Sequence, residues 1–434
     1  METRLLLLER LTLDHYRNYT HLEARFGEGV IVLQGANAQG KTNLLEAIYL
    51  LATTKSARAR SDVDLISWGP PDPFSPTAFS RVAAHVTRVR GPVDVEILIQ
   101  DLSDEYTSNG AVSALSAGAV DAEADGEAGG AVGAQRGGGR KRALPRGDGQ
   151  SARKRFKING VPRRAGEVLG QVNAVLFAPT DVAIVDGSPS ARRRYLDVIL
   201  CQAHPSYYRA LQGYNKVLVQ RNSLLRGIRD RVQPPEALSF WDSKLVEYGA
   251  TVVARRAEAL AYLATAAAEQ HARVSGGRER LEVAYLSSTP LDSEGTGGVR
   301  AAFEGELAAQ RARELGAGVS LVGPHRDDIG MAIGGVDVTS YGSRGQQRTV
   351  ALALKLAELA YIKREAGEWP ILLLDDATSE LDAPRRAAVL ALTRELPQVF
   401  LTTAEPDHLA GLLDGTHTTP QVWQVEGGAL TPIN

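Results

Sequence analysis

Residues 35–42 read GANAQGKT and fit the pattern G-x-x-x-x-G-K-[ST]. An apolar strand pattern at residues 30–33 precedes them, and a helical pattern at residues 44–51 follows. In a strand–loop–helix unit of this kind, backbone N–H groups and the helix N-terminus surround phosphate oxygens. The pattern arises by chance in on the order of one chain in a hundred of this length, and correct flanks make it rarer. The sequence therefore predicts a nucleotide-binding loop in an α/β fold.

The loop chemistry assigns roles to single residues. Lys41 is expected to reach the β- and γ-phosphates, and the Thr42 hydroxyl is expected to ligate Mg²⁺. Arg17 lies ahead of the loop and suits the nucleotide, although it could simply pack at a strand end. The residues of the loop predicted to bind nucleotide are Gly35, Ala36, Asn37, Ala38, Gln39, Gly40, Lys41, Thr42 and Asn43.

Two carboxylates close an apolar stretch in the C-terminal third. Residues 371–374 read as a buried strand, and Asp375 and Asp376 follow it. Asp375 suits Mg²⁺, directly or through water, and Asp376 can polarise an attacking water. Residues 379–382, SELD, come next. The predicted catalytic residues are Lys41, Asp375, Asp376 and Ser343, and the predicted Mg²⁺ ligands are Thr42 and Asp375.

Residues 342–346, GSRGQ, open a helix predicted over residues 347–363. A small Ser-x-Gly turn at a helix start can bind an anion, and such a site would be idle in a monomer that already has a phosphate loop. A plain N-cap is an equally good interpretation of Ser343. Ser343 and Gln346 are therefore candidates for contacts with a nucleotide held by another subunit.

Composition excludes several classes of protein. The 434 residues are 44% hydrophobic, so a sizeable core is available and wholesale disorder is excluded. The formal charge of −2 excludes a uniformly basic surface for nucleic acid, but it permits a local basic patch. A single cysteine, Cys201, excludes a disulfide framework. No apolar tract reaches the length of a membrane span, so we expect a cytoplasmic protein without membrane contact.

Three segments are expected. Residues 1–178 would form the N-terminal half of an α/β head, in which the Gly/Ala-rich residues 108–152 are a flexible insertion between strands. Residues 179–300 would form a helical arm, and residues 301–434 the C-terminal half of the head. In the arm, two stretches with heptad spacing flank Pro234-Pro235, which predicts an antiparallel helical hairpin or an ordinary helical subdomain.

The phosphate loop, the GSRGQ turn and the paired carboxylates, in this order, resemble the ATP-binding-cassette (ABC) family of ATPases. Residues 342–346 then stand at the signature motif. The resemblance implies a head-to-head homodimer, in which ATP lies between the loop of one subunit and Ser343 of the other. A head split by a helical insertion resembles the structural-maintenance-of-chromosomes branch.

Within that branch the chain resembles the RecF family of bacterial recombination mediators. The resemblance implies an ATPase that binds DNA in an ATP-dependent way and acts in gap repair. It also implies loading of RecA at gaps coated by single-strand-binding protein, with RecR and RecO as partners. The matching stretches are residues 16–19, 37–49, 54–56, 177–181, 187–194, 323–328 and 343–348.

The chain departs from these families at several positions. Ala57 and Arg58 stand where the family usually has a histidine before an arginine. Thr402 and Thr403 occupy the region of the switch histidine, and Asp376 is shorter than the usual glutamate. The missing histidine and the shorter acid predict slow hydrolysis, which fits an ATP-gated clamp better than a high-flux engine.

Basic clusters are the candidates for DNA contact, although each could be a solvated face. Two alternatives to a RecF-type protein stay open: an architectural chromosome ATPase without a loading role, and a transporter-associated ATPase. Among the histidines, His325 is interpreted as a satisfied structural group, and His204 and His271 as surface residues. The arginines predicted to contact DNA are Arg192, Arg193, Arg194, Arg255 and Arg256.

Overall fold

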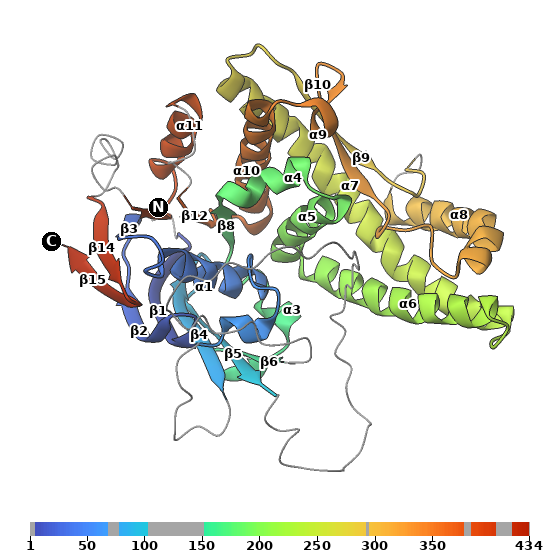
Figure 1. Cartoon of the computed structure of the whole chain (residues 1–434), viewed down its shortest axis with the longest axis horizontal. Coiled ribbons are helices and arrows are strands. Elements are labelled where there is room, and N and C mark those ends of the chain that lie inside the picture. The colour runs from blue at the N-terminus through green and yellow to red at the C-terminus, as the bar shows by residue number, and fades with distance from the viewer. Residues whose placement is uncertain are drawn as a thin grey trace, which may run out of the picture.

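The computed structural model describes residues 5–67, 78–102, 152–291, 295–376, 383–404 and 419–433. Most strands belong to two six-stranded sheets, and a small three-stranded sheet lies near the arm (Figure 1). The strands are β1 (Leu7–Tyr16), β2 (Tyr19–Arg25), β3 (Gly29–Gln34), β4 (Phe79–Thr87), β5 (Val93–Asp101), β6 (Ala152–Ile158), β7 (Val161–Arg163), β8 (Ala174–Phe177), β9 (Leu281–Leu286), β10 (Asp328–Ile333), β11 (Val336–Asp337), β12 (Ile371–Leu374), β13 (Gln398–Thr403), β14 (Gln421–Glu426) and β15 (Ala429–Ile433).

Helices cover the sheets and build the arm. Three of them are single 3₁₀ turns: η1 (Asp62–Leu65), η2 (Pro179–Val182) and η3 (Pro235–Ala237). The α-helices are α1 (Lys41–Thr53), α3 (Ala165–Val168), α4 (Ala183–Asp186), α5 (Pro189–Ala203), α6 (Pro205–Arg229), α7 (Leu238–Ser275), α8 (Gly295–Ala317), α9 (Val338–Tyr341), α10 (Arg344–Ala366) and α11 (Ala383–Thr393).

The mixed sheet joins the two ends of the chain. Its order is β15-β14-β3-β13-β12-β8, and only β15 runs antiparallel to its neighbour. β3, from the N-terminal third, therefore lies between two strands from the C-terminal third, as the blue and red ribbons in Figure 1 show. This confirms the predicted ABC-type head assembled from both ends of the chain.

Both faces of the mixed sheet are buried, as expected for parallel strands that read as continuous apolar runs. Along β3, Val30 and Val32 face a core shared with α5, α7 and α10. Ile31 and Leu33 face a second core shared with α1 and the antiparallel sheet. The head therefore has layers in which α1 lies between two sheets and α10 covers the opposite face of the mixed sheet.

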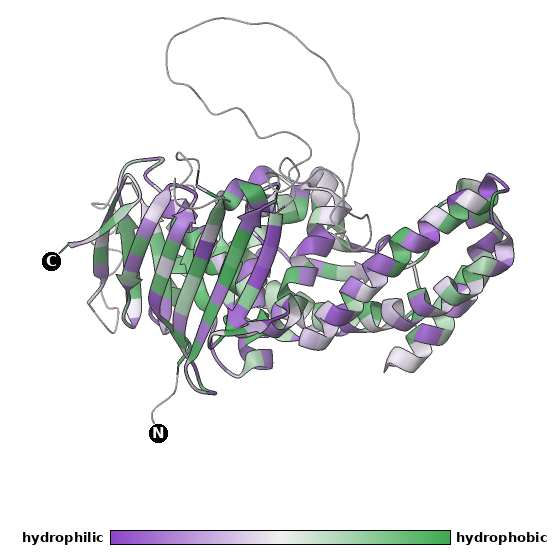
Figure 2. Ribbon diagram, turned by 90° about the horizontal axis from the view of Figure 1, so that it is seen from below, coloured by the Kyte–Doolittle hydropathy of each residue, from purple (hydrophilic) through white to green (hydrophobic). Residues whose placement is uncertain are grey.

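The antiparallel sheet has the order β2-β1-β4-β5-β6-β7. Hydrophobic and hydrophilic residues alternate along its strands (Figure 2), which fits one face on the core and one in water. Asn159 and Gly160, with φ of 50° and 76°, form the tight turn between β6 and β7 that the sequence predicts. Residues 108–151 of the predicted Gly/Ala-rich insertion lie outside the described residues, and residue 152 begins β6.

α6 and α7 form the predicted antiparallel hairpin, and α8 packs on both of them (Figure 1). We call α6, the first half of α7 and α8 the arm. The second half of α7 packs along α10, so this helix connects the arm to the head. The expected arm boundary at residue 300 falls inside α8, whose Phe303 and Leu307 belong to the arm core. The arm therefore continues to the end of α8.

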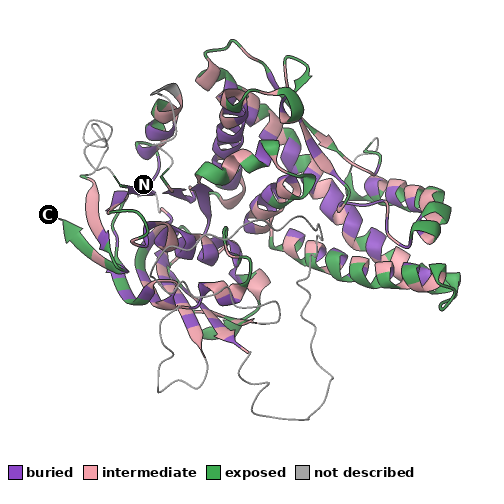
Figure 3. Ribbon diagram, in the orientation of Figure 1, coloured by how far each residue is buried: buried purple, intermediate pink, exposed green. Residues whose placement is uncertain are grey.

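Arg221 interrupts the heptad pattern of α6 and lies in the arm core with 1% of its surface exposed. Its guanidinium donates to Asp242 of α7 at 2.7 Å and to Glu314 of α8 at 2.6 Å. Glu314 is also fully buried. A single arginine thus joins the three arm helices, along which buried and exposed residues alternate (Figure 3).

His325 lies at the base of the arm and has a partner on each ring nitrogen. Nε2 lies 3.1 Å from the Ser320 carbonyl oxygen, which can only accept, so Nε2 carries the proton and donates it. Nδ1 therefore accepts from the Tyr214 hydroxyl at 2.6 Å. The interpretation of His325 as a satisfied group is therefore confirmed. His271, in contrast, is fully buried, so its prediction as a surface residue is wrong. Among the described residues, no helix is both long and apolar enough to cross a membrane.

We expect Arg221→Ala to destabilise the fold by about 3–5 kcal/mol, because it leaves the buried Glu314 carboxylate without its partner. Arg209→Ala, an exposed arginine on the same helix, is the control and should change the free energy of unfolding by less than about 0.5 kcal/mol. Urea unfolding followed by circular dichroism measures both. Equal effects of the two substitutions would show that the contact of Arg221 with the other two arm helices does not contribute to the free energy of unfolding.

The pH dependence of the free energy of unfolding tests whether His325 is buried in its neutral form. Burial, together with the charges of Arg326 and Arg193, lowers the pKa of His325 from about 6.5 to about 4. As pH falls below about 6.5 the unfolded chain takes up the proton first, so stability on the order of 3 kcal/mol is lost by about pH 4. In urea titrations between pH 7.5 and 4.5, wild type should lose more stability than His325→Gln. Parallel curves for the two proteins would contradict this.

Candidate nucleotide-binding site

The loop between β3 and α1 curls because its glycines permit it. Gly35 and Gly40 have φ of 151° and 116°, and Ala38 between them also has a positive φ of 65°. A Cβ at Gly35 would lie 2.3 Å from the Val425 carbonyl oxygen, and one at Gly40 would lie 2.5 Å from Asn18 Nδ2. Both glycines are therefore required by conformation and by space.

Lys41 begins α1 and folds back over the loop. Its ammonium donates to the carbonyl oxygens of Gly35 at 2.6 Å and Ala36 at 2.9 Å. Burial lowers the pKa of Lys41, and the carboxylates of Asp376 and Asp375 oppose this shift. The Lys41 ammonium, the only cation of the loop, therefore lies on the inner side of the loop. When a nucleotide binds, a phosphate oxygen would replace the two carbonyl oxygens as its partner.

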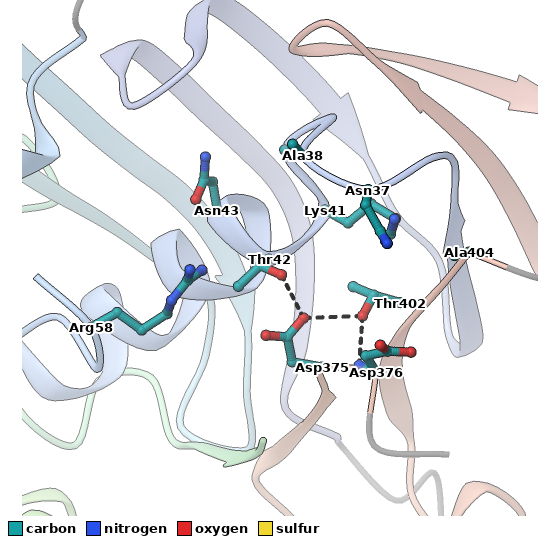
Figure 4. Close-up of a pocket in the computed structure, with 11 residues that line it drawn as sticks. Asn37, Ala38, Lys41, Thr42, Asn43, Arg58, Asp375, Asp376, Thr402 and Ala404 are labelled. Atoms are coloured by element: carbon teal, nitrogen blue, oxygen red, sulfur yellow. Dashed lines mark hydrogen bonds between the residues drawn. The ribbon is translucent and has the colours of Figure 1, made fainter. Parts of the chain in front are cut away.

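The carboxylates come from the adjacent part of the mixed sheet. Asp375 Oδ1 accepts from Thr42 Oγ1 at 2.8 Å and lies 3.1 Å from Thr402 Oγ1 (Figure 4). The backbone N–H of Asp376 donates to Thr402 Oγ1 at 2.8 Å. β3, β12 and β13 are parallel, so their carboxyl ends meet at one edge of the sheet. The Thr402 hydroxyl therefore connects the carboxylate of Asp375 with the backbone of Asp376.

These groups surround a pocket of about 210 Å³. Gly35, Ala36 and Gln39 belong to the loop without lining the pocket, and Gln39 instead accepts from the Asn18 side chain. Arg58, Thr402 and Ala404 are pocket residues to which the sequence assigned no role. The lining residues are Asn37, Ala38, Gly40, Lys41, Thr42, Asn43, Arg58, Asp375, Asp376, Thr402 and Ala404.

The Thr42 hydroxyl and the Asp375 carboxylate fit the predicted Mg²⁺ ion. Their oxygens are 2.8 Å apart beside the loop, and both are hard oxygen donors of the kind that Mg²⁺ prefers. These are the two residues that would hold the ion.

Arg17 lies outside the pocket. Its guanidinium forms a bidentate pair with Glu46 of α1 at 2.9 Å and donates to the Asp64 carbonyl. Its neighbours are closer to the loop: Asn18 donates to the Gln39 carbonyl, and the Tyr19 hydroxyl donates to the Gly40 carbonyl, both at 2.9 Å. This segment therefore supports the loop from outside, a role that the sequence alone does not reveal.

The predicted signature turn is elsewhere on the head. Ser343 is the N-cap of α10: its Oγ accepts from Gln346 N at 3.2 Å, and Gln346 Oε1 accepts from Ser343 N at 2.9 Å. Ser343 is exposed and is not among the residues that line the pocket of its own chain. The N-cap interpretation is thus confirmed, and it leaves the Ser343 hydroxyl hydrogen free for a further acceptor.

Arg385 of α11 contacts the same turn. It donates to the Gly345 carbonyl at 2.7 Å and to the Thr349 hydroxyl at 2.7 Å. α11 follows residues 379–382, which lie outside the described residues. In the sequence, Arg385 and Arg386 are adjacent, and no sequence motif indicates which of them contacts the turn.

Most arginines predicted to contact DNA serve the fold. Arg192 is 5% exposed and paired with Asp328, and Arg256 is 3% exposed and paired with Asp197. Their burial argues against contact with phosphates. Arg193 and Arg194 each donate to a backbone carbonyl. Arg255 is only half-buried, with 43% of its side chain exposed, and pairs with Glu258 of its own helix, so it stays a candidate.

Comparison with known proteins places this geometry in a family. No protein-family model matches the chain. DNA replication and repair protein RecF of Chloroflexus aurantiacus is 39% identical over 405 residues, which cover 92% of this chain and 93% of that protein. The RecF protein of Roseiflexus castenholzii is 37% identical over 428 residues and covers 97% of this chain and 98% of its own length.

A solved structure agrees. The recombination mediator protein RecF-ATPrS in the RecFOR pathway superposes with a TM-score of 0.77 at 28% identity, over 99% of both chains. Family-level identity along nearly the whole length, together with the loop and the paired acids on one sheet edge, decides the assignment. The chain belongs to the RecF family of DNA replication and repair proteins, with an ABC-type ATPase head.

Proposed function

We propose that this chain is an ATP-dependent DNA-binding ATPase that closes as a homodimer around two ATP molecules at DNA gaps. The observation that carries the proposal is the divided site. One chain supplies a phosphate loop with two acids, whereas its exposed Ser343 turn lies outside that pocket. A second copy would complete each pocket with its own Ser343 turn.

In this mechanism the loop N–H groups and Lys41 bind the β- and γ-phosphates. Thr42 and Asp375 would hold Mg²⁺, which neutralises charge on the phosphate oxygens. Asp376, at the end of β12, orients the attacking water and takes up its proton. Arg58 lines the same pocket and adds positive charge near the phosphates. RecF structures with ATP and ATPrS support ATP as the ligand.

Hydrolysis should be slow. Thr402 and Thr403 occupy the region of the switch histidine, and the Thr402 hydroxyl is already engaged by Asp375 and by the Asp376 N–H. A threonine hydroxyl also carries no charge near neutral pH, so it cannot stabilise the developing negative charge as an imidazolium can. We therefore infer a state switch with long-lived bound ATP.

The proposed cellular role is repair at replication gaps in the cytoplasm, with RecO and RecR as partners in RecA loading. Family membership and relatives described in the RecFOR pathway support it. The short arm argues against the alternative function, an architectural chromosome ATPase. α6 has 25 residues and so spans only about 37 Å, far from a long coiled coil.

Light scattering tests the divided site. Wild type should move from 46.5 kDa to twice that mass on adding ATP and Mg²⁺, and gapped DNA should strengthen the shift. Ser343→Arg should bind ATP as a monomer, because the larger side chain blocks the second copy while leaving the pocket of its own chain intact. Dimers without ATP, or a wild type that stays monomeric with ATP, would refute the mechanism.

Asp376→Asn tests the role of the second acid. It should lower kcat for ATP hydrolysis by about 10²–10⁴-fold, because the amide cannot accept the proton of the attacking water. ATP affinity and ATP-dependent dimerisation should change little. Asp230→Asn, on the exposed end of the arm, is the matched control and should leave steady-state turnover unchanged. Full turnover in Asp376→Asn would assign the base to another residue.

A further inference from the structure

A carboxylate that follows the head end of α7 reaches the signature turn. Residues 276–280 connect α7 to β9. Glu279, in this connection, accepts from Gln346 Nε2 with Oε1 at 2.8 Å. The same Gln346 side chain accepts from Ser343 N at 2.9 Å through Oε1. Three residues therefore form one hydrogen-bonded chain that ends on the backbone of Ser343.

The charge of Glu279 decides which way the Gln346 amide points. A glutamine amide has one donor end and one acceptor end, and an ionised carboxylate can only accept. The NH₂ end of Gln346 must therefore face Glu279, which leaves the carbonyl end for the Ser343 N–H. With the amide reversed, two oxygens would meet at Glu279 and two N–H groups would meet at Ser343.

The other oxygen of Glu279 faces the last turn of α7. Oε2 lies 3.7 Å from Nε2 of His271, which is fully buried. α7 itself extends over 38 residues from the tip of the arm to a position beside α10 (Figure 1). Glu279 thus lies between the helix that connects arm and head and the turn that carries Ser343.

We propose that Glu279 is a positioning residue of the signature turn. By orienting Gln346, it holds the Ser343 backbone and hydroxyl in the geometry that receives a phosphate group from the ATP of a second copy. The inference rests on the proposed divided site. Glu279 acts through Gln346 and not on the nucleotide, because a carboxylate at the phosphate itself would repel it.

Through Glu279, the end of α7, the helix that connects the arm to the head, would help to form the site between two copies. The pocket of the same chain is lined mainly by the phosphate loop, the start of α1 and the residues at the ends of β12 and β13, whereas Glu279 contacts Gln346 and His271. Loss of Glu279 should therefore affect the dimer and spare nucleotide binding by the monomer. A purely structural role would instead lower thermal stability and affect both properties together.

The experiment compares Glu279→Ala and Glu279→Gln with Glu282→Ala. Glu282, on the neighbouring β9, has an exposed side chain and pairs only with Arg280 at 3.6 Å, so it is the matched control. Each substitution is also combined with Ser343→Arg, which keeps the protein monomeric, and the affinity of this double variant for a fluorescent ATP analogue measures nucleotide binding by the monomer. Sedimentation with ATP and Mg²⁺ reports the dimer, and steady-state hydrolysis separates kcat from KM.

We expect Glu279→Ala to weaken ATP-dependent dimerisation about tenfold, since a charge-assisted hydrogen bond is lost. It should lower kcat in parallel while nucleotide affinity of the monomer stays within about twofold. Glu279→Gln keeps an acceptor oxygen for Gln346 and should restore dimerisation to within about threefold of wild type. Glu282→Ala should match wild type.

A double-mutant cycle shows whether Glu279 acts through Gln346. In a Gln346→Ala background, Glu279→Ala should have no further effect on the dimer, and additive losses would overturn the proposal. If Glu279→Ala does not fold, Glu279→Met, which also removes the acceptor but keeps the length of the side chain, takes its place in the cycle. Dimerisation of Glu279→Ala equal to that of its control overturns this inference alone. A wild type that stays monomeric with ATP overturns the proposed function and this inference with it.

Discussion

The hydrogen bond from Thr42 to Asp375 joins residues 333 positions apart, and the nucleotide site depends on it. It can form only because β3 is inserted between β13 and β14, which brings the ends of strands from both chain termini to one edge. Parallel strands offer no other arrangement in which a loop after one strand meets the carboxylates after another. The site therefore belongs to the completed fold and to neither half of the chain.

Buried ion pairs connect several parts of the molecule. Arg221 joins the arm helices, Arg256 joins α7 to Asp197 of α5, Arg192 joins α5 to Asp328 of β10, and Arg88 pairs with Glu368 across the head. Such pairs gain little net stability, since desolvation offsets their attraction, but a mispaired state is costly. They therefore favour one relative placement of the arm and the head. A near-zero net charge is consistent with charges paired inside the fold.

The sequence anticipated features that depend on local pattern. The apolar runs of β3 and β12, the loop that begins with Gly35 and the turn at Asn159 need only neighbouring residues to be recognised. Burial of a charged residue depends on distant partners, which is why Arg192 resembled a DNA contact and His271 a surface residue. α8 was missed at its start because Gly295 and Gly297 conceal a helix whose Phe303 and Leu307 have helical spacing. The supports of the phosphate loop, Asn18 and Tyr19, bind backbone carbonyls, so the match of residues 16–19 to the family did not reveal their role.

The same architecture explains why a weak catalyst suits this head. α1 and α10 pack on opposite faces of the mixed sheet, so the phosphate loop and the Ser343 turn are fixed to one rigid layer. In the proposed dimer, ATP would connect two such layers directly, and its loss would separate them without any need for movement inside a head. The lifetime of the closed state would then equal the time that ATP survives. In the proposed mechanism, a threonine in place of a charged switch residue would lengthen that time.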